Sequence, residues 1–316
     1  MFELARASFA ASRALATVSC ASTPAADLLV MKFIEAEGVK VHVATWGEGE
    51  EILLIHGASS DMDVFLPTVI PLLEPRYQLT AYDRPGMGFT LKRPPRAETL
   101  AVQAKVAAEV IVAMELKRPI VVAHSYGGAV ALRLALDRPD LISGLVLIAP
   151  VAYDWPGGVS WYLYWSANPV IGGLFNAAAQ PFTDAAAREG VKGAFFPRLP
   201  PEDYFEKASV ARATTPGAMR SNGLDLLAAK REVTAQQEQY SEIAIPVAIM
   251  VGDSDTVVSP SIHAEQLSHA LPNVRLEVVQ GAGHVPHEGE PNVLAALIAW
   301  VNAQAKLRPA AQTRMS

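Results

Sequence analysis

A serine lies in a setting that would make it a nucleophile, within the segment Ala123-His124-Ser125-Tyr126-Gly127-Gly128. This segment joins a buried apolar run to a helical pattern, so Ser125 is expected at the tip of a tight turn with its hydroxyl directed outward. Small neighbours are needed there because the strand and the helix must approach each other closely. The alternative is that Ser125 only caps the helix that follows.

A nucleophilic serine needs a base, and the base needs an acid that orients it. The base candidate is His284, which follows Gly281-Ala282-Gly283, a loop free enough to bring an imidazole back over a sheet. The acid candidates are Asp253 and Asp255, directly after a predicted strand, with Asp154 as a third. A hydroxyl, an imidazole and a carboxylate acting together would transfer an acyl group through a covalent intermediate.

Metal and cofactor sites are not indicated by the sequence. His287 lies three residues after His284, a spacing that could suggest a metal, but no Cys or carboxylate cluster completes a tetrahedral site, so no metal is expected. We interpret His287 as a surface residue or a contact of a lid. No glycine-rich phosphate loop follows the first strand, so no nucleotide cofactor is expected.

The candidate residues follow strands in a chain where strands and helices alternate. A strand-like run begins at Met31. Further strands are predicted at 39–45, 51–55, 77–82, 119–123, 143–149, 245–251 and 274–279, and helices at 97–116, 126–136, 260–270 and 292–305. This alternation predicts an α/β fold with a mostly parallel sheet and helices on both of its faces.

The alternation stops after Pro150. Residues 151–242 show helical stretches divided by Gly and Pro, and no strong strand. We therefore expect an α/β core at 31–150 and 243–308, and an inserted helical cap at 151–242. Residues 1–30 are expected to form a separate N-terminal extension.

Aromatic residues are concentrated near the start of the predicted cap. Trp155, Trp161 and Trp165 are our candidates for lining the substrate site, because rigid aromatic side chains over a serine would make an apolar, water-poor pocket. Trp161 and Trp165 also lie at helical spacing, so they could equally form the core of the cap.

Four separated motifs resemble those of the alpha/beta hydrolase family, over about residues 33–305. The segment around Ser125 resembles the family's nucleophile elbow, with Ala123 in place of the more usual first glycine. Gly252-x-x-Asp255 resembles the acid turn, and Gly-x-Gly-His284 followed by Glu290-Pro291 resembles the histidine loop. The resemblance implies a catalytic triad of Ser125, Asp255 and His284, with Asp253 as a turn former.

The same resemblance extends to the segment that would bind the oxyanion. His56-Gly57 at the end of a strand resembles the family's oxyanion loop, which implies the backbone N–H groups of Ala58 and Tyr126 as donors. The segment Asp83-Arg84-Pro85-Gly86-Met87-Gly88 resembles the family's Asp-x-x-Gly-x-Gly turn. This turn and the His56 side chain are expected to be structural.

The type of nucleophile narrows the reaction. A serine suits attack on an acyl carbon, whereas the family's epoxide hydrolases and dehalogenases use a carboxylate. We expect an enzyme that hydrolyses carboxylic esters of small to medium, largely apolar substrates. The same triad would also suit a cofactor-free perhydrolase or haloperoxidase-like activity, or hydrolysis of lactones, amides or carbon–carbon bonds. A non-catalytic ligand receptor on the same scaffold is the alternative from another class.

Composition excludes several other classes. The 316 residues carry 26 Lys plus Arg against 32 Asp plus Glu, so no basic excess is available to neutralise a nucleic acid. A single cysteine, Cys20, excludes an intramolecular disulfide framework. No apolar run reaches the length of a membrane-spanning helix. With the acyl chemistry that the resemblance implies, the expected partner is a small-molecule ester.

The first thirty residues allow several interpretations. Phe2 and Phe9 lie two helical turns apart, as do Arg6 and Arg13, which predicts an amphipathic segment able to contact a membrane surface or the protein itself. Export is the alternative, but Arg13 interrupts the apolar stretch that a secretory signal requires. We therefore expect a cytoplasmic location.

Overall fold

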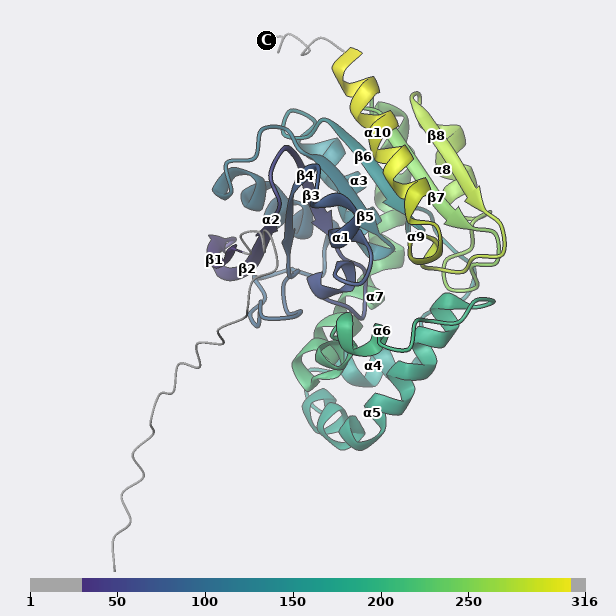
Figure 1. Ribbon diagram of the computed structural model, residues 1–316. Helices are drawn as coiled ribbons and strands as arrows, with labels where there is room; N and C mark the ends of the chain where they lie inside the picture. Colours follow the sequence, from purple (N-terminus) through teal and green to yellow (C-terminus); the bar gives the residue numbers. More distant parts are fainter. Residues whose placement is uncertain (1–29, 308–316) are drawn as a thin grey trace, which may run out of the picture.

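A computed structural model describes residues 30–307, so the predicted amphipathic segment and the chain after Leu307 lie outside the described residues. Its centre is an eight-stranded sheet in the order β1-β2-β4-β3-β5-β6-β7-β8 (Figure 1). The strands are β1 (Val30–Ala36), β2 (Val39–Trp46), β3 (Glu50–Ile55), β4 (Tyr77–Tyr82), β5 (Ile120–His124), β6 (Gly144–Ile148), β7 (Val247–Gly252) and β8 (Val274–Val279). Within the described residues, β2 is the one strand that runs against the others.

Helices cover both faces of this sheet. The helices α2 (Leu100–Ala113), α3 (Tyr126–Asp137) and α8 (Ala264–Ala270) contribute to one apolar cluster, and α1 (Val69–Leu73) and α10 (Pro291–Leu307) contribute to the other. Alternate residues of β5 face the two clusters, with Val121 on one side and Val122 on the other. The central strands are therefore apolar along their whole length, as in a sheet buried on both faces.

The predicted α/β fold is confirmed, and several strand boundaries agree closely. The ranges 77–82 and 274–279 match β4 and β8 to the residue. The predicted helix at 97–116 is shorter in the structure, because Thr99 caps it by accepting a hydrogen bond from Val102 N–H. The short helices α1 and α9 (Pro286–Gly289) were not predicted, since a few residues cannot show a helical period.

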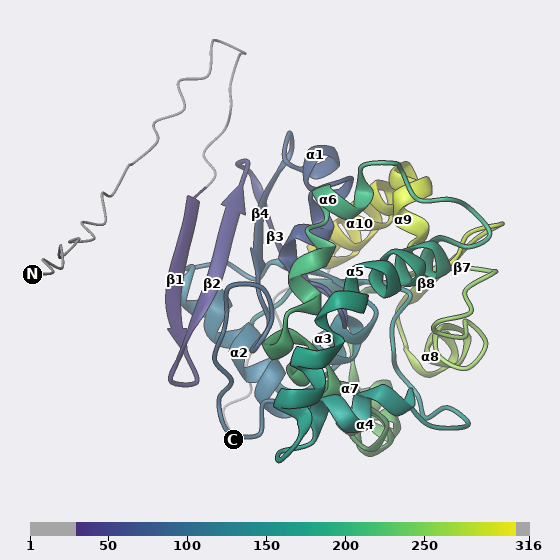
Figure 2. The same cartoon turned by 90° about the horizontal axis from the view of Figure 1, so that it is seen from below.

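The chain between β6 and β7 forms helices and no strand, and we call residues 151–242 the cap. Its elements are α4 (Trp161–Ala167), α5 (Gly172–Phe195), α6 (Tyr204–Lys207), η2 (Val210–Thr214), α7 (Pro216–Gln236) and η3 (Gln237–Glu242). In Figure 1 the helices α4 to α7 lie together below the sheet, at one end of its strands, and Figure 2, seen from below, looks onto these helices. That the cap is a domain separate from the core remains a prediction.

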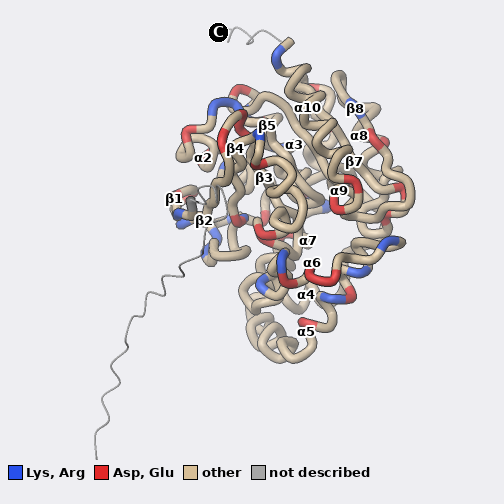
Figure 3. The backbone as a smooth tube through the Cα atoms, in the orientation of Figure 1, with Lys and Arg blue, Asp and Glu red and all other residues tan. Residues whose placement is uncertain are grey.

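The part of the cap formed by α4 and the first half of α5 carries no charge. No Asp, Glu, Lys, Arg or His occurs between Asp154 and Asp184, and this region is tan in Figure 3.

Within residues 30–307, no helix combines the length and the apolar character needed to cross a bilayer.

Candidate active site

Ser125 occupies a strained turn between β5 and α3. Its backbone has φ 54° and ψ −120°, a conformation that side chains rarely adopt and that costs about 1–3 kcal/mol. The turn is held because Ser125 N–H donates to Ile148 O at 2.9 Å and Ser125 O accepts from Gly128 N–H at 2.9 Å. A Cβ at Gly127 would lie 2.5 Å from Ile55 O, so glycine is required there. The fold thus presents the Ser125 hydroxyl at the carboxyl end of the sheet.

The structure brings Ser125, His284 and Asp255 together from the ends of three strands. His284 Nε2 lies 2.9 Å from Ser125 Oγ, and His284 Nδ1 lies 2.8 Å from Asp255 Oδ2. Asp255 Oδ1 accepts hydrogen bonds from the N–H groups of Val257 and Val258, which fixes the carboxylate. With an ionised carboxylate at Nδ1, the proton of a neutral imidazole resides on Nδ1 and leaves Nε2 free to accept the serine proton.

The other two acid candidates lie elsewhere. Asp253 Oδ1 accepts from Gly281 N–H at 2.8 Å and from Ser254 Oγ at 2.9 Å, so it ties the acid turn to the histidine loop. Asp154 pairs with Lys230 Nζ at 3.2 Å. Of the three acids, Asp255 is the one in contact with His284.

The backbone of His284 is held from both sides. Its N–H donates to Ala194 O, in the last turn of α5, at 2.7 Å, and its carbonyl accepts from His124 Nε2 at 3.0 Å. Burial, followed by the charges of His284 and His287, lowers the pKa of His124 well below its usual range. His124 is therefore a neutral donor that positions the histidine loop from within the core.

The predicted oxyanion donors belong to two segments next to Ser125. A Cβ at Gly57 would lie 3.0 Å from Ser125 Cβ, which places the loop that carries Ala58 beside the serine. Among residues 30–307, the Ala58 N–H has no acceptor. Tyr126 begins α3, so its N–H belongs to the first turn, where helix donors have no partner within the helix. That both groups bind an oxygen at Ser125 remains a prediction.

The neutral side chain of His56 shapes the same loop. His56 Nε2 accepts from Arg84 N–H at 2.9 Å, which leaves Nδ1 as the donor to Gly57 O at 2.9 Å. Burial, and then the charge of Arg84, lowers the pKa of His56 well below its usual range. The imidazole is accordingly a fixed structural link.

A family of known proteins matches this fold and this order of motifs. The match, to a family described as alpha/beta hydrolase fold, covers residues 51–291. The chain belongs to this family.

Two relatives and one solved structure illustrate the range of this alpha/beta hydrolase's similarities. It is 25% identical over 283 residues to the 2-(acetamidomethylene)succinate hydrolase of Mesorhizobium japonicum, covering 88% of this chain and 98% of that protein. It is 26% identical over 261 residues to the pimeloyl-(acyl-carrier protein) methyl ester esterase of Nitrosomonas europaea, covering 78% of this chain and 93% of that protein. The epoxide hydrolase CorEH superposes with a TM-score of 0.71 at 19% identity, over 89% of this chain and 100% of that one, which is a likeness of fold.

The Asp83 turn of this alpha/beta hydrolase is built around one buried carboxylate. Asp83 accepts from Met62 N–H at 3.0 Å, from Phe89 N–H at 2.8 Å and from His42 Nδ1 at 2.8 Å. A Cβ at Gly88, where φ is +51°, would lie 2.2 Å from the Asp83 carboxyl group, so the turn requires glycine. These contacts agree with the structural role expected from the sequence.

The predicted tryptophans differ in their surroundings. Trp155 is partly buried, and its ring lies 6.0 Å from that of His263. Trp161 and Trp165 expose 69% and 48% of their surface on α4, whereas the buried apolar residues of that helix are Leu163 and Ala167. Trp161 and Trp165 are thus not core residues of the cap, and their contact with a substrate remains a prediction.

Of the two interpretations of His287, the surface residue is wrong, and the contact with the lid stays a prediction. The His287 side chain is 1% exposed, because α9 turns it inward, where the centre of its ring lies 5.4 Å from that of His124. Burial, and then the charge of His284, lowers its pKa to about 3. His287 Nε2 lies 3.5 Å from Glu288 Oε1, but a neutral imidazole forms no ion pair there.

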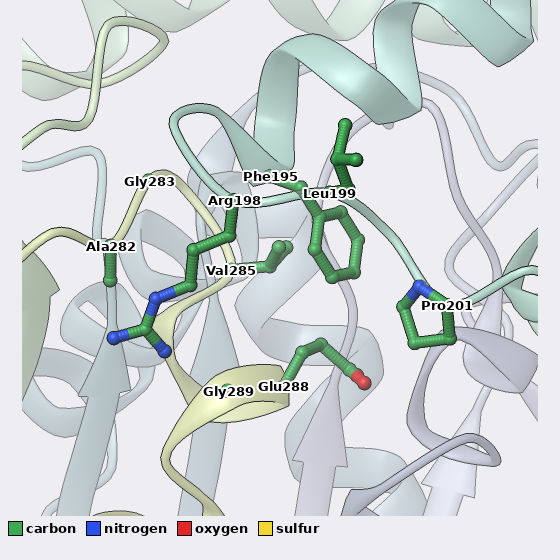
Figure 4. Close-up of a pocket in the computed structure, with 9 residues that line it drawn as sticks. All are labelled: Phe195, Arg198, Leu199, Pro201, Ala282, Gly283, Val285, Glu288 and Gly289. Atoms are coloured by element: carbon green, nitrogen blue, oxygen red, sulfur yellow. The ribbon is translucent and has the colours of Figure 1, made fainter.

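Glu288 lines a cavity of about 110 Å³ behind the histidine loop. Figure 4 shows Phe195, Leu199 and Pro201 of the cap around this space, together with Val285 and Glu288 of the loop. Thr68 Oγ1 donates to Glu288 Oε2 at 2.6 Å, while burial raises the pKa of Glu288 to about 7. None of the lining residues belongs to the triad. Among the residues that the structure describes, no group of three or more His, Cys, Asp or Glu is arranged to bind a metal.

The Glu288 carboxyl predicts a pH-dependent stability. Because its folded pKa of about 7 lies above the ordinary value of 4.5, the proton it retains stabilises the fold at low pH, and this contribution is lost as the pH rises through 7. Glu288→Gln should therefore be more stable than the wild type at pH 8, by at most about 3 kcal/mol, and by less than about 1 kcal/mol at pH 5. Urea unfolding at both pH values measures this, with Glu202→Gln, at an exposed residue, as the control. An equal difference at pH 5 and pH 8 would contradict the assignment.

Proposed function

We propose that this alpha/beta hydrolase cleaves carboxylic esters through Ser125, His284 and Asp255. The observation that carries the proposal is the continuous relay from Ser125 Oγ through the imidazole to the Asp255 carboxylate, with contacts of 2.9 and 2.8 Å. A buried serine at a positive φ, paired with an oriented base, is the arrangement required for nucleophilic catalysis.

The proposed reaction has two halves. In the first, His284 Nε2 accepts the Ser125 proton while Oγ attacks the acyl carbon, and the imidazolium then gives the proton to the leaving alcohol. In the second, His284 activates water, which releases the acid and regenerates Ser125. The N–H groups of Ala58 and Tyr126 would bind the oxyanion in both halves, and losing one such donor typically costs about 3 kcal/mol.

The proposed substrate class is a small to medium ester with an apolar acyl or alcohol group. Ser125 is 8% exposed, so a substrate must leave water to reach it. The uncharged stretch between Asp154 and Asp184 offers no counterion to a charged substrate. Because a serine and not a carboxylate stands at the nucleophile turn, the likeness to an epoxide hydrolase is taken as one of fold. The two named relatives, a hydrolase and a methyl ester esterase, support acyl cleavage.

A series of p-nitrophenyl esters from acetate to decanoate tests the proposal. We expect nitrophenol release that is fastest for short to medium acyl chains and that depends on Ser125, because the buried site limits the length of the acyl group. The control is the Ser125→Ala protein at the same concentration. Release no faster than with this control, across the whole series, would contradict the proposal and favour a binding protein.

A further inference from the structure

We propose that Arg84, held by Asp225 of the cap, aims the Ala58 N–H at the oxyanion, so that docking of the cap and binding of the oxyanion are coupled. This inference rests on the proposed function, since it assigns positioning residues to the same site. Neither residue stood out in the sequence as part of that site.

The Gly57–Ala58 peptide group links Arg84 to the oxyanion donor. Its carbonyl oxygen, Gly57 O, accepts a hydrogen bond from Arg84 Nη2 at 2.9 Å, and its N–H is the one that Ala58 would offer to the oxyanion. This peptide bond is trans, and in a planar trans peptide the C=O and N–H point in opposite directions. Arg84 shares this carbonyl with His56 Nδ1, which donates to it at 2.9 Å, and the two donors together fix the direction of the carbonyl and so of the Ala58 N–H. The positive charge of the Arg84 guanidinium, next to Gly57 O, also polarises the peptide group and strengthens its N–H as a donor.

Arg84 also contacts the segment that carries the second donor. Its Nε donates to His56 O at 3.1 Å, and its Cζ lies 4.6 Å from the centre of the Tyr126 ring. One guanidinium therefore contacts both segments that supply the proposed donors, the His56–Ala58 loop and Tyr126.

The cap supplies the counterion that keeps Arg84 in place. Asp225, in α7, accepts from Arg84 Nη1 at 2.9 Å, and both side chains are fully buried. Arg93 Nη2 donates to the other oxygen of Asp225 at 2.6 Å. A buried guanidinium that loses its carboxylate is strongly destabilised, so the Arg84 geometry depends on α7 being docked.

A second residue of α7 holds the loop on the other side of Ala58. Asn222 Oδ1 accepts from Ser59 N–H at 2.8 Å, and Asn222 Nδ2 donates to Ser59 Oγ at 2.9 Å. Together, Asn222 and Asp225 fix the residues on both sides of the Ala58 donor from a single cap helix.

Another ion-pair cluster between the cap and the core serves as a matched control. Arg212, in η2, pairs with Asp61 and Asp63 of the core. None of its hydrogen bonds reaches residues 56–58 or Tyr126. Breaking it should remove one cap–core ion pair while Asn222 and Asp225 keep α7 docked, so the Gly57–Ala58 peptide should keep its direction.

The test compares Asp225→Asn, Arg84→Lys and Arg212→Ala with the wild type in p-nitrophenyl butyrate hydrolysis. Active protein is counted by titration with a fluorophosphonate, and the Ki of an alkyl trifluoromethyl ketone reports binding of a tetrahedral alkoxide. We expect Asp225→Asn and Arg84→Lys to lower kcat about 10- to 100-fold and raise Ki by a similar factor, less than the about 10²–10³ of a fully lost donor. KM should change less than about threefold. Arg212→Ala should change kcat, KM and Ki by less than about twofold each.

Several results would overturn the coupling. These are a folded Asp225→Asn protein with the kcat and Ki of the wild type, a loss confined to KM, or an equal loss in Arg212→Ala. If Asp225→Asn does not fold, Asn222→Ala takes its place, because it leaves Arg84 paired, and it should lower kcat and weaken ketone binding in parallel. A wild type inert to both ester and phosphonate would contradict the proposed function, whereas an active wild type with unchanged variants contradicts this inference alone.

Discussion

Ser125→Ala is expected to lower kcat for p-nitrophenyl butyrate by at least about 10⁴-fold while leaving the unfolding temperature within a few degrees of the wild type. The Ser125 hydroxyl is the group that forms the bond to the acyl carbon. In the described residues, no other hydroxyl is in contact with His284 Nε2. Alanine meets the same backbone strain as serine at φ 54°, so the fold should survive. Steady-state kinetics and thermal unfolding of the two proteins measure both quantities.

The matched control for this variant is Ser254→Ala. Ser254 Oγ donates a hydrogen bond to Asp253 Oδ1 in the acid turn, which is near the triad but outside it. Its kcat should stay within about threefold of the wild type. A Ser125→Ala protein that retains a tenth of wild-type activity would remove Ser125 from the role of nucleophile.

Asp255→Asn is expected to lower kcat by about 10⁴-fold, because a neutral amide beside Nδ1 favours the wrong imidazole tautomer and cannot stabilise the imidazolium. Asp253→Asn should stay within about threefold, since the Asp253 carboxylate contacts Gly281 N–H and not the imidazole. Both substitutions change the same functional group two residues apart, so each serves as the control for the other. Steady-state kinetics on p-nitrophenyl butyrate measure kcat of the two variants. A larger loss of kcat in Asp253→Asn than in Asp255→Asn would show that the acid has been misassigned.

The sheet was predictable because its strands are short apolar runs between turns. The segment 77–82 is a short run bounded by turns, and its last four residues are buried in the sheet. The Ser125, Asp255 and His284 segments were predictable for a related reason. Each segment has a local requirement, such as glycine beside a strained turn, so the residues needed lie within a few positions of the catalytic candidate and form a motif.

The contacts that the sequence did not predict are those between distant residues. Arg84 and Asp225 are separated by 141 positions, and neither has a local motif that identifies the other. The burial of His287 was not predicted, because α9 is too short to show the period that would have revealed its buried face. Such features depend on tertiary packing, which fixes which polar groups meet.

The most direct test of the central claim is mass spectrometry of the protein after rapid acid quench during turnover of p-nitrophenyl butyrate. The relay of Ser125, His284 and Asp255 predicts one butyryl group on the peptide that contains Ser125, formed and lost at rates consistent with kcat. Steady turnover with no such adduct, or with the butyryl group on a different residue, would contradict the covalent mechanism.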